Sequence, residues 1–365
     1  MSFITTFTSL LRAILCIVNN LYAIPVYLCL YLLLQPLRIF SPLTFWAIEG
    51  WLYEKLLSMV AFWAQLSGHE IFTSGDDISS IINDESILMT NHQSSGDIPV
   101  LMHALRGTRP SLRGVMWIMD WVLQFLSFGW IAKGHGDFFL LQGSDIRKFP
   151  FLFSGSEAQI KIDGMKRFKK HLVDVYCKRD RKWMILFPEG GFLHKRREGS
   201  WRFSKRNNLP LLNNVTIPRV GAFQAIVDVL GVEGVKNGLN KDSLGKKHIK
   251  WIIDVTIGYA KNEPLGITSW VMGSGGPKKV YLHYRVFRSS DMMTKVGEGG
   301  GYSVSEAWIY DRFIEKDKLL KDFFATGKFP PGKQGLKPVK CYTISTLIGH
   351  VFCLLPYFIL AYSIF

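Results

Sequence analysis

Short apolar runs separated by turn-forming and charged residues predict the strands of a sheet. Such strands are expected at residues 87–90, 183–187, 215–218, 251–259 and 279–287, and the last alternates apolar and polar positions. Residues 157–178 carry apolar side chains on one side and lysines on the other, which predicts an amphipathic helix. Strands alternating with helices favour an α/β domain over residues 67–335, with a mixed, largely parallel sheet flanked by helices.

Two uncharged segments predict membrane anchors. Residues 13–37 contain no charge and neither do residues 341–365, whereas about 20 apolar residues are enough to cross a bilayer. Pro25 and two asparagines within the first segment leave open whether it spans or re-enters the membrane, and a signal peptide is an alternative. Residues 42–66 fit either an interfacial amphipathic helix or a core helix. We therefore expect an anchor region at 1–66 and a C-terminal transmembrane helix at 336–365.

The charge and the cysteine content indicate the kind of binding partner and the cellular compartment. The formal net charge is +15, and residues 101–210 hold 21 Lys and Arg against 9 Asp and Glu. This indicates an anionic partner, such as a phosphorylated substrate or a membrane surface, and no RNA-binding pattern accompanies it. Five cysteines without a CxxC pair favour a reducing compartment. Lys333, Lys337 and Lys340 precede the last apolar segment, so the positive-inside rule places the main domain in the cytoplasm.

The stretch SILMTNHQSSGDIPVL at residues 86–101 predicts a strand, a turn and a helix. His92 leaves the end of the strand and Asp97 stands at the start of the helix. That placement suits side chains that perform chemistry. An ordinary turn in which Ser95 or Asp97 caps the helix is the alternative.

A second strand ends in the turn FPEGG, where Glu189 precedes Gly190 and Gly191. Glycines allow a ligand to approach the backbone closely. Three basic residues follow, namely Lys195, Arg196 and Arg197. Open α/β sheets bind ligands at the carboxyl ends of their strands, which favours a phosphate-binding site here over a solvated charged face.

Together, these two motifs resemble those of a known family. Residues 91–97 match the NHxxxxD signature of the glycerolipid acyltransferases, and residues 187–190 match their FPEG block. Weaker blocks correspond to residues 136–142 and to residues 215–218, which end in Pro218. Residues 135–139, 187–193, 207–210 and 214–219 are most similar to members that acylate lysophosphatidylglycerol. Gln142 stands where many relatives have arginine, and Arg147 is a candidate substitute.

The resemblance implies transfer of an acyl group from acyl-CoA to a lysophospholipid hydroxyl, with lysophosphatidylglycerol or lysophosphatidylethanolamine as acceptor. His92 would act as general base, and Asp97 would fix its tautomer and stabilise the imidazolium. Asn91 and Ser94 are expected among the substrate-binding residues, and Asn91 would position the loop or donate a hydrogen bond. Backbone N–H groups of residues 93–96 would stabilise the oxyanion. Lysophosphatidate or monoacylglycerol are alternative acceptors.

The remaining site residues follow from the same resemblance. Glu189 is expected to bind a glycerol hydroxyl or to brace its turn, and the basic residues after it are expected to neutralise phosphates. Residues 116–130 would line an acyl-chain tunnel or belong to the core. No metal or redox cofactor is implied, because acyl-CoA is a substrate, and the family favours the endoplasmic reticulum membrane. A hydrolase is disfavoured by the lack of a GxSxG motif. A non-catalytic lipid-binding scaffold stays as an alternative, and the motifs do not specify an oligomeric state.

Overall fold

The computed structural model describes residues 3–107, 112–231, 247–295, 302–340 and 343–364. Within them, an eight-stranded sheet has the order β10-β1-β7-β6-β2-β5-β3-β4. Its strands are β1 (Glu70–Gly75), β2 (Ser86–Thr90), β3 (Val115–Asp120), β4 (Phe138–Leu140), β5 (Trp183–Leu186), β6 (Trp251–Tyr259), β7 (Lys279–Arg288) and β10 (Lys337–Pro338). A separate ribbon pairs β8 (Met293–Lys295) with β9 (Tyr302–Val304).

The direction of the strands determines where ligands can bind. Five neighbours, β6, β2, β5, β3 and β4, run parallel to one another. β1 and β7 are also parallel, whereas the β6–β7 and β1–β10 pairs are antiparallel. The mixed, mostly parallel sheet predicted from the sequence is therefore confirmed. The chain leaves the five parallel strands along one side of the sheet, called the carboxyl edge below.

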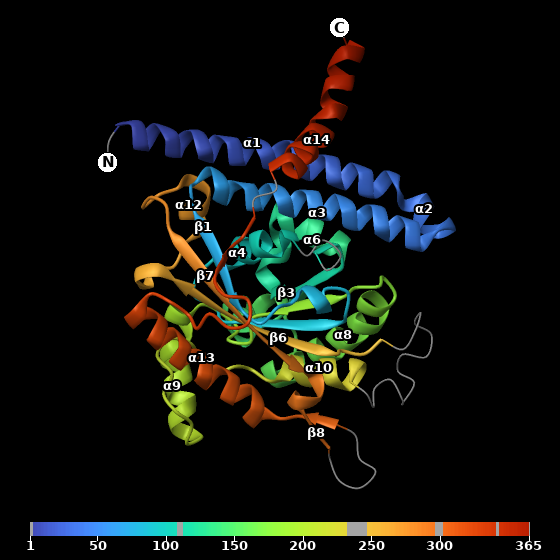
Figure 1. Ribbon diagram of the computed structural model, residues 1–365. Helices are drawn as coiled ribbons and strands as arrows, with labels where there is room; N and C mark the ends of the chain where they lie inside the picture. Colours follow the sequence, from blue (N-terminus) through green and yellow to red (C-terminus); the bar gives the residue numbers. More distant parts are fainter. Residues whose placement is uncertain (1–2, 108–111, 232–246, 296–301, 341–342, 365) are drawn as a thin grey trace.

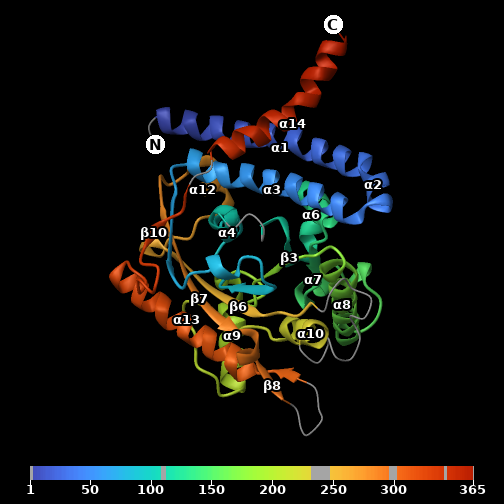
Figure 2. The same ribbon diagram turned by 45° about the vertical axis from the view of Figure 1, so that its right-hand side comes forward.

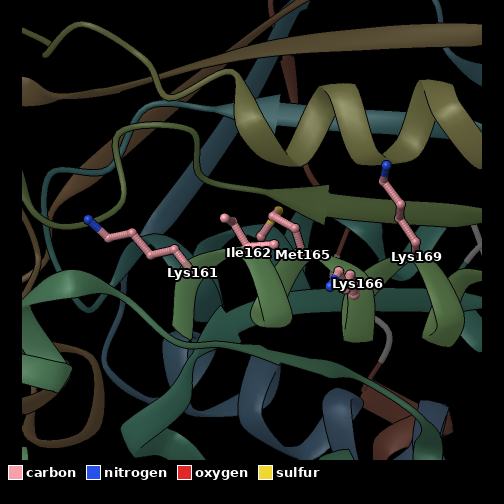
Figure 3. A pocket seen from close by; sticks show the side chains of 5 residues that line it. All are labelled: Lys161, Ile162, Met165, Lys166 and Lys169. Carbon is pink, nitrogen blue, oxygen red and sulfur yellow. The ribbon is translucent and has the colours of Figure 1, made fainter. Parts of the chain in front are cut away.

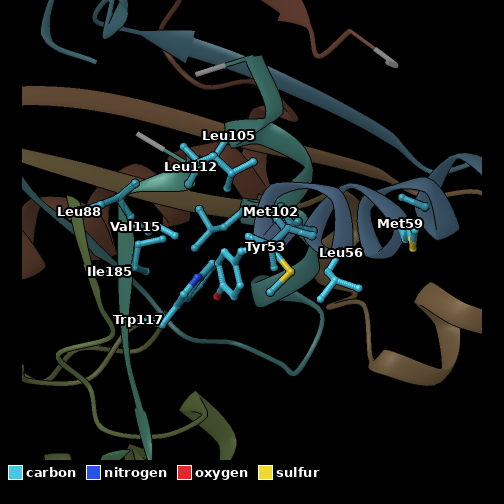
Figure 4. Close-up of a cluster of buried hydrophobic side chains, with 14 of the residues drawn as sticks. Tyr53, Leu56, Met59, Leu88, Met102, Leu105, Leu112, Val115, Trp117 and Ile185 are labelled. Atoms are coloured by element: carbon cyan, nitrogen blue, oxygen red, sulfur yellow. The ribbon is translucent and has the colours of Figure 1, made fainter. Parts of the chain in front are cut away.

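Helices cover both faces of the sheet (Figures 1 and 2). On one face lie α3 (Pro42–Leu66), α4 (Asp97–Ala104) and α6 (Ser127–His135), with α1 (Phe3–Leu33) and α14 (Thr343–Ile364) stacked above α3. Figure 4 shows the core of this face, where Tyr53 and Leu56 of α3 meet Met102 of α4 and Trp117 of β3. The opposite face is covered by α8 (Glu157–His171), α10 (Gly221–Leu230) and α13 (Glu306–Thr326).

Shorter helices complete the chain. The α-helices among them are α2 (Gln35–Phe40), α7 (Gly143–Lys148), α9 (Leu193–Arg206) and α12 (Ile267–Met272). The helical turns are η1 (Ser79–Ile81), η2 (Leu105–Gly107), η3 (Trp121–Phe125), η4 (Pro150–Leu152), η5 (Leu172–Cys177), η6 (Ala260–Asn262) and η7 (Ser289–Met292). η5 has π-helical geometry and continues α8, so the long helix predicted over residues 157–178 is present.

Both apolar end segments form long helices. α1 continues through Pro25, and both α1 and α14 are long and apolar enough to cross a membrane. They contact each other where the Tyr22 hydroxyl meets His350 at 2.5 Å. Apolar side chains such as Leu33 of α1 and Phe358 of α14 remain exposed. Such a surface is typical of helices that meet lipid.

The helix over residues 42–66 is a core helix. α3 lies between α1 and α4 and buries much of its length, including Glu49. This carboxylate accepts hydrogen bonds from the Tyr27 hydroxyl at 2.6 Å and contacts His135 Nδ1 at 2.7 Å and Arg181 Nη2 at 3.3 Å. Burial lowers the pKa of His135 to about 4, which keeps the ring neutral at neutral pH. The network fastens α1 and α3 to the sheet, and it places His135 inside the protein.

One predicted strand is wrong. Residues 215–218 form an extended loop, because their polar backbone groups bind side chains instead of a neighbouring strand. The Thr216 N–H donates to Glu189 at 2.7 Å, and the Ile217 N–H donates to Ser200 at 2.9 Å. Because these backbone groups already have hydrogen-bond partners, the short apolar run does not need to pair with a neighbouring strand.

Candidate active site

The NHxxxxD segment forms a tight turn at the carboxyl edge, between β2 and α4. It brings the Nδ1 atom of His92 to 2.8 Å from Oδ2 of Asp97. The Asp97 side chain is 1% exposed and that of His92 is 12% exposed, so the imidazole is the member of the pair that solvent and ligands reach. Within the described residues, Nε2 of His92 has no hydrogen-bond partner. The pair therefore presents one free imidazole nitrogen, oriented by a buried carboxylate.

Asp97 accepts hydrogen bonds on both oxygens. Oδ2 accepts the backbone N–H groups of Gln93 at 2.7 Å and Ser94 at 3.0 Å in addition to its contact with His92. Oδ1 accepts the hydroxyl of Tyr259, which is fully buried at the end of β6. The N–H groups of Gln93 and Ser94 were expected to stabilise an oxyanion. That expectation is wrong for these two, because both already bind Asp97.

β6 and the loop after it hold the turn from the other side. The Asn91 side chain bonds both the N–H and the C=O of Ile257, at 2.8 and 3.0 Å. The Ser94 hydroxyl donates to the carbonyl of Leu265 at 2.5 Å. Gly96 lies so close that a Cβ atom there would be 2.0 Å from the same carbonyl oxygen. Asn91 and Ser94 thus position the turn, and Gly96 is required by close packing.

Glu189 connects the two motifs. One of its carboxylate oxygens accepts the His92 N–H at 2.6 Å, and the other accepts the Thr216 N–H and hydroxyl at 2.7 and 2.9 Å. Burial raises its pKa from 4.5 to about 7, although these hydrogen bonds oppose the shift. Of the two roles expected for Glu189, this geometry matches the brace. The aromatic rings of Phe187 and Phe192 enclose the His92 ring, with centroids at 4.2 and 4.5 Å.

A pair of arginines converges beside this turn. Arg196 Nη2 donates to Oε1 of Gln142 at 2.5 Å and to the Gly190 carbonyl at 2.6 Å, and Arg219 Nη1 donates to the same Gln142 oxygen at 3.2 Å. Among the described residues, neither guanidinium forms an ion pair with a carboxylate. Two cations that share one neutral oxygen are suited to a bound anion. Arg147 is not part of this cluster, because it pairs with Glu157 at 3.0 Å.

The other predicted site residues lie around the same turn. Gly190 and Gly191 have positive φ angles of 66° and 152°, which favour glycine. Lys195 is exposed on α9 with Nζ 5.5 Å from the Phe192 ring centroid. Arg197 is partly buried on α9, and within the described residues no hydrogen bond joins it to the Arg196–Arg219 pair or to Gln142. Pro218 is buried between Thr216 and Arg219 in the loop that packs on Glu189.

The lysine-rich face of α8 is separate from this site. Figure 3 shows a shallow hollow there, lined by Lys161, Ile162, Met165, Lys166 and Lys169. The three lysines pair with acidic groups, Lys161 with Glu157 at 2.6 Å, Lys166 with Asp163 at 3.5 Å and Lys169 with Asp228 at 2.5 Å. These pairs are exposed to solvent, so each contributes little to stability. In the 116–130 stretch, Met116 and Trp117 belong to the core, whereas Phe125 and Trp130 are exposed.

Comparison with known proteins identifies the family. Residues 274–349 match the family model described as acyltransferase C-terminus. The chain is 41% identical over 331 residues to acyl-CoA:lysophosphatidylglycerol acyltransferase 1 of Homo sapiens, covering 89% of this chain and 84% of the human protein. The mouse protein of the same name is 41% identical over 341 residues, covering 91% and 86%. The chain belongs to the glycerolipid acyltransferases. A putative 1-acyl-sn-glycerol-3-phosphate acyltransferase of Caenorhabditis elegans is 30% identical over 313 residues, covering 84% and 74%.

Membership establishes this glycerolipid acyltransferase as an enzyme, and its two long apolar helices agree with membrane association. Two residues of the site were not predicted individually from the sequence. Tyr259 ends a strand that was recognised only by its apolar pattern, and Arg219 follows the proline of a weak block. The basic character of Arg219 next to a predicted substrate block was the available signal. For Tyr259 there was none, because its partner lies 162 positions away.

Proposed function

We propose that this enzyme transfers an acyl group from acyl-CoA to the hydroxyl of a lysophospholipid, with lysophosphatidylglycerol as acceptor. The observation that carries the proposal is the His92–Asp97 pair with its open Nε2, placed beside two arginines that form no ion pair with a carboxylate in the described part of the chain. The names of the human and mouse relatives support the acceptor.

His92 is the general base in this proposal. Nε2 takes the proton of the acceptor hydroxyl as its oxygen attacks the thioester carbonyl, and Asp97 stabilises the resulting imidazolium. The tetrahedral intermediate then collapses, the C–S bond breaks, and the proton passes from the imidazolium to the leaving thiolate of coenzyme A. Because the thioester is already activated, the reaction uses no covalent enzyme intermediate and no further cofactor.

Arg196 and Arg219 bind the phosphate of the acceptor in this proposal. Their guanidinium groups converge on Gln142 and flank the Gly190 turn, whose neighbour Glu189 holds the His92 backbone. A phosphate held there would lie next to the turn that carries the base. Guanidinium groups match phosphate geometry through paired hydrogen bonds.

We place the enzyme in the endoplasmic reticulum membrane with the catalytic domain facing the cytoplasm. α1 and α14 are the candidate anchors. Lys333, Lys337 and Lys340 precede α14, and this cluster of positive charge supports the orientation through the positive-inside rule. Protease protection of an epitope-tagged chain in microsomes tests this placement, and a tag near residue 200 should be digested in intact vesicles.

The acceptor is tested by following labelled oleoyl and stearoyl groups from coenzyme A. The purified protein is offered lysophosphatidylglycerol, lysophosphatidylethanolamine, lysophosphatidate and monoacylglycerol. We expect lysophosphatidylglycerol to be acylated most efficiently and His92→Ala to be inactive while still folded. His171→Gln is the control, because this histidine lies on α8 on the other face of the sheet. Preference for another acceptor, or an active His92→Ala protein, contradicts the proposal.

The phosphate subsite is tested separately. Arg196→Gln and Arg219→Gln should raise KM for lysophosphatidylglycerol by about 10-fold or more, since a charged hydrogen bond contributes roughly 1.5–3 kcal/mol. The uncharged monoacylglycerol should be affected far less. Arg206→Gln, at the end of the same helix as Arg196, is the matched control. Equal losses for charged and uncharged acceptors would show that the arginines act only on the fold.

A further inference from the structure

We infer that Tyr259 is a positioning residue that sets the proton affinity of the His92–Asp97 pair by donating its hydroxyl hydrogen to Asp97. This inference rests on the proposed role of His92 as general base. Tyr259 bonds to Oδ1 of Asp97 whereas His92 contacts Oδ2, so the effect of Tyr259 passes through the carboxylate. Nothing in the NHxxxxD motif itself predicts the contact, because Tyr259 comes from the end of β6.

The hydrogen-bond distribution around Asp97 supports this role. Oδ2 receives three donors, namely His92 Nδ1, Gln93 N and Ser94 N at 2.7–3.0 Å, whereas Oδ1 receives the Tyr259 hydroxyl. Asp97 and Tyr259 are both fully buried, so water cannot easily replace the phenol. Burial raises the pKa of Tyr259 well above 10, and it therefore stays a donor across the working pH range.

The contact also fixes the carboxylate in space. Asn91 binds Ile257, two residues before Tyr259, and Ser94 binds Leu265, six residues after it. The three contacts attach the turn to one continuous segment, residues 257–265. The Tyr259 hydroxyl is the member of this set that reaches the dyad itself.

Removing the hydroxyl should increase the effective charge that Asp97 presents to His92. A donor to a carboxylate disperses its charge and lowers its proton affinity, so its loss raises the proton affinity of the coupled pair. The base is then protonated at a higher pH and is lost for catalysis earlier as the pH falls. Other charged or titratable groups next to the pair are Glu189, which accepts the His92 N–H, and His194 and Lys195, which contact the Phe192 ring that packs on His92. The comparison of variant with wild type keeps all of these constant.

The test is the pH profile of kcat/KM for Tyr259→Phe. We expect its acidic limb to move upward by about 0.5–1 pH unit, with a fall in kcat of about 10-fold. Tyr176→Phe is the matched control, because Tyr176 is also fully buried and donates its hydroxyl to a backbone carbonyl, that of Lys182, at 2.8 Å. Both variants should lose thermal stability, but only Tyr259→Phe should shift the acidic limb of the pH profile. An unshifted limb overturns the inference.

A second measurement covers the case in which Tyr259→Phe does not fold. Incorporation of 3-fluorotyrosine at position 259 preserves the hydroxyl and makes it a stronger donor, so the limb should move downward. In both proteins, the pH dependence of His92 modification by diethyl pyrocarbonate, read by mass spectrometry, reports the same shift without any substrate. An unshifted modification profile refutes the role of Tyr259, whereas an inactive wild type refutes only the proposed acceptor chemistry.

Discussion

Replacing Asp97 by Asn removes a charge while leaving the hydrogen-bond geometry of the turn nearly intact. The amide oxygen can take the place of Oδ2 and accept the N–H groups of Gln93 and Ser94. The amide NH2 group then faces the Tyr259 oxygen, which can accept a hydrogen bond. The Tyr259 hydroxyl hydrogen then loses its carboxylate acceptor in a buried site, so we expect a loss of stability of about 1–3 kcal/mol.

The Asp97→Asn substitution should affect the rate of acyl transfer far more than it affects stability. His92 Nδ1 lies 2.8 Å from Asp97 Oδ2, which places the charge centres of an imidazolium and the carboxylate roughly 3–4 Å apart. At an effective dielectric constant of about 20, their attraction amounts to about 4–6 kcal/mol. The transition state, in which the imidazole has taken a proton, loses this stabilisation. The expected fall in kcat is therefore about 10³- to 10⁴-fold.

The assay is single-turnover transfer of a labelled oleoyl group to lysophosphatidylglycerol, with thermal unfolding measured on the same preparations. Single-turnover conditions isolate the chemical step from release of coenzyme A. Asp137→Asn is the control, because this buried carboxylate also accepts a backbone N–H, that of Trp117 at 2.8 Å, and a tyrosine hydroxyl, that of Tyr53 at 3.2 Å. A loss of less than about 10-fold in the Asp97→Asn protein would refute the electrostatic role assigned to Asp97.

Three further outcomes follow from the packing around the site. Between pH 4.5 and about 7 the folded protein keeps a proton on Glu189 that the unfolded chain releases. The free energy of unfolding should therefore fall by about 3 kcal/mol as the pH rises through this window. Chemical denaturation of the Glu189→Gln protein should show no such fall. Gly96→Ala should destabilise the protein by several kcal/mol and abolish transfer, since its Cβ would lie 2.0 Å from the Leu265 carbonyl oxygen; normal thermal unfolding would contradict this. Lys316→Met leaves the fully buried Asp254 without its 2.5 Å partner and should cost roughly 3 kcal/mol in urea titrations, whereas an unchanged midpoint would show that the remaining contacts suffice.

The sheet could be predicted where local pattern determines structure. β2, β5, β6 and β7 are apolar or alternating runs with clear boundaries, and the predicted ranges match them closely. The 215–218 run has the same local composition, but its backbone groups are used by Glu189 and Ser200. β3 was hidden because its buried residues merge with the exposed aromatic run after Asp120. Residue pattern reports burial, and it does not report which backbone groups find partners elsewhere.

The two motifs of the site were visible in sequence because their residues are local. The His92–Asp97 contact spans a five-residue turn, and the Gly190 turn follows directly from FPEGG. Arg219 and Tyr259 could not be found in this way, since their contacts join segments far apart in the chain. Arg147 looked a suitable replacement for the missing arginine by position, but the structure pairs it with Glu157. Selecting among nearby cations requires the tertiary fold.

The tether between the catalytic turn and residues 257–265 has a consequence for how the enzyme acquires activity. The bonds from Asn91 to Ile257 and from Ser94 to Leu265 join positions 166 and 171 residues apart, and the Glu189 bond to the His92 backbone spans 97. During synthesis, a nascent chain that ends before β6 holds both members of the dyad yet lacks the groups that orient them. Contacts of such high sequence separation form late, because the loop they close must first lose its entropy. Acyl transfer therefore reports long-range assembly, and the growing chain stays inactive until residues 257–265 have been made and have packed on the turn.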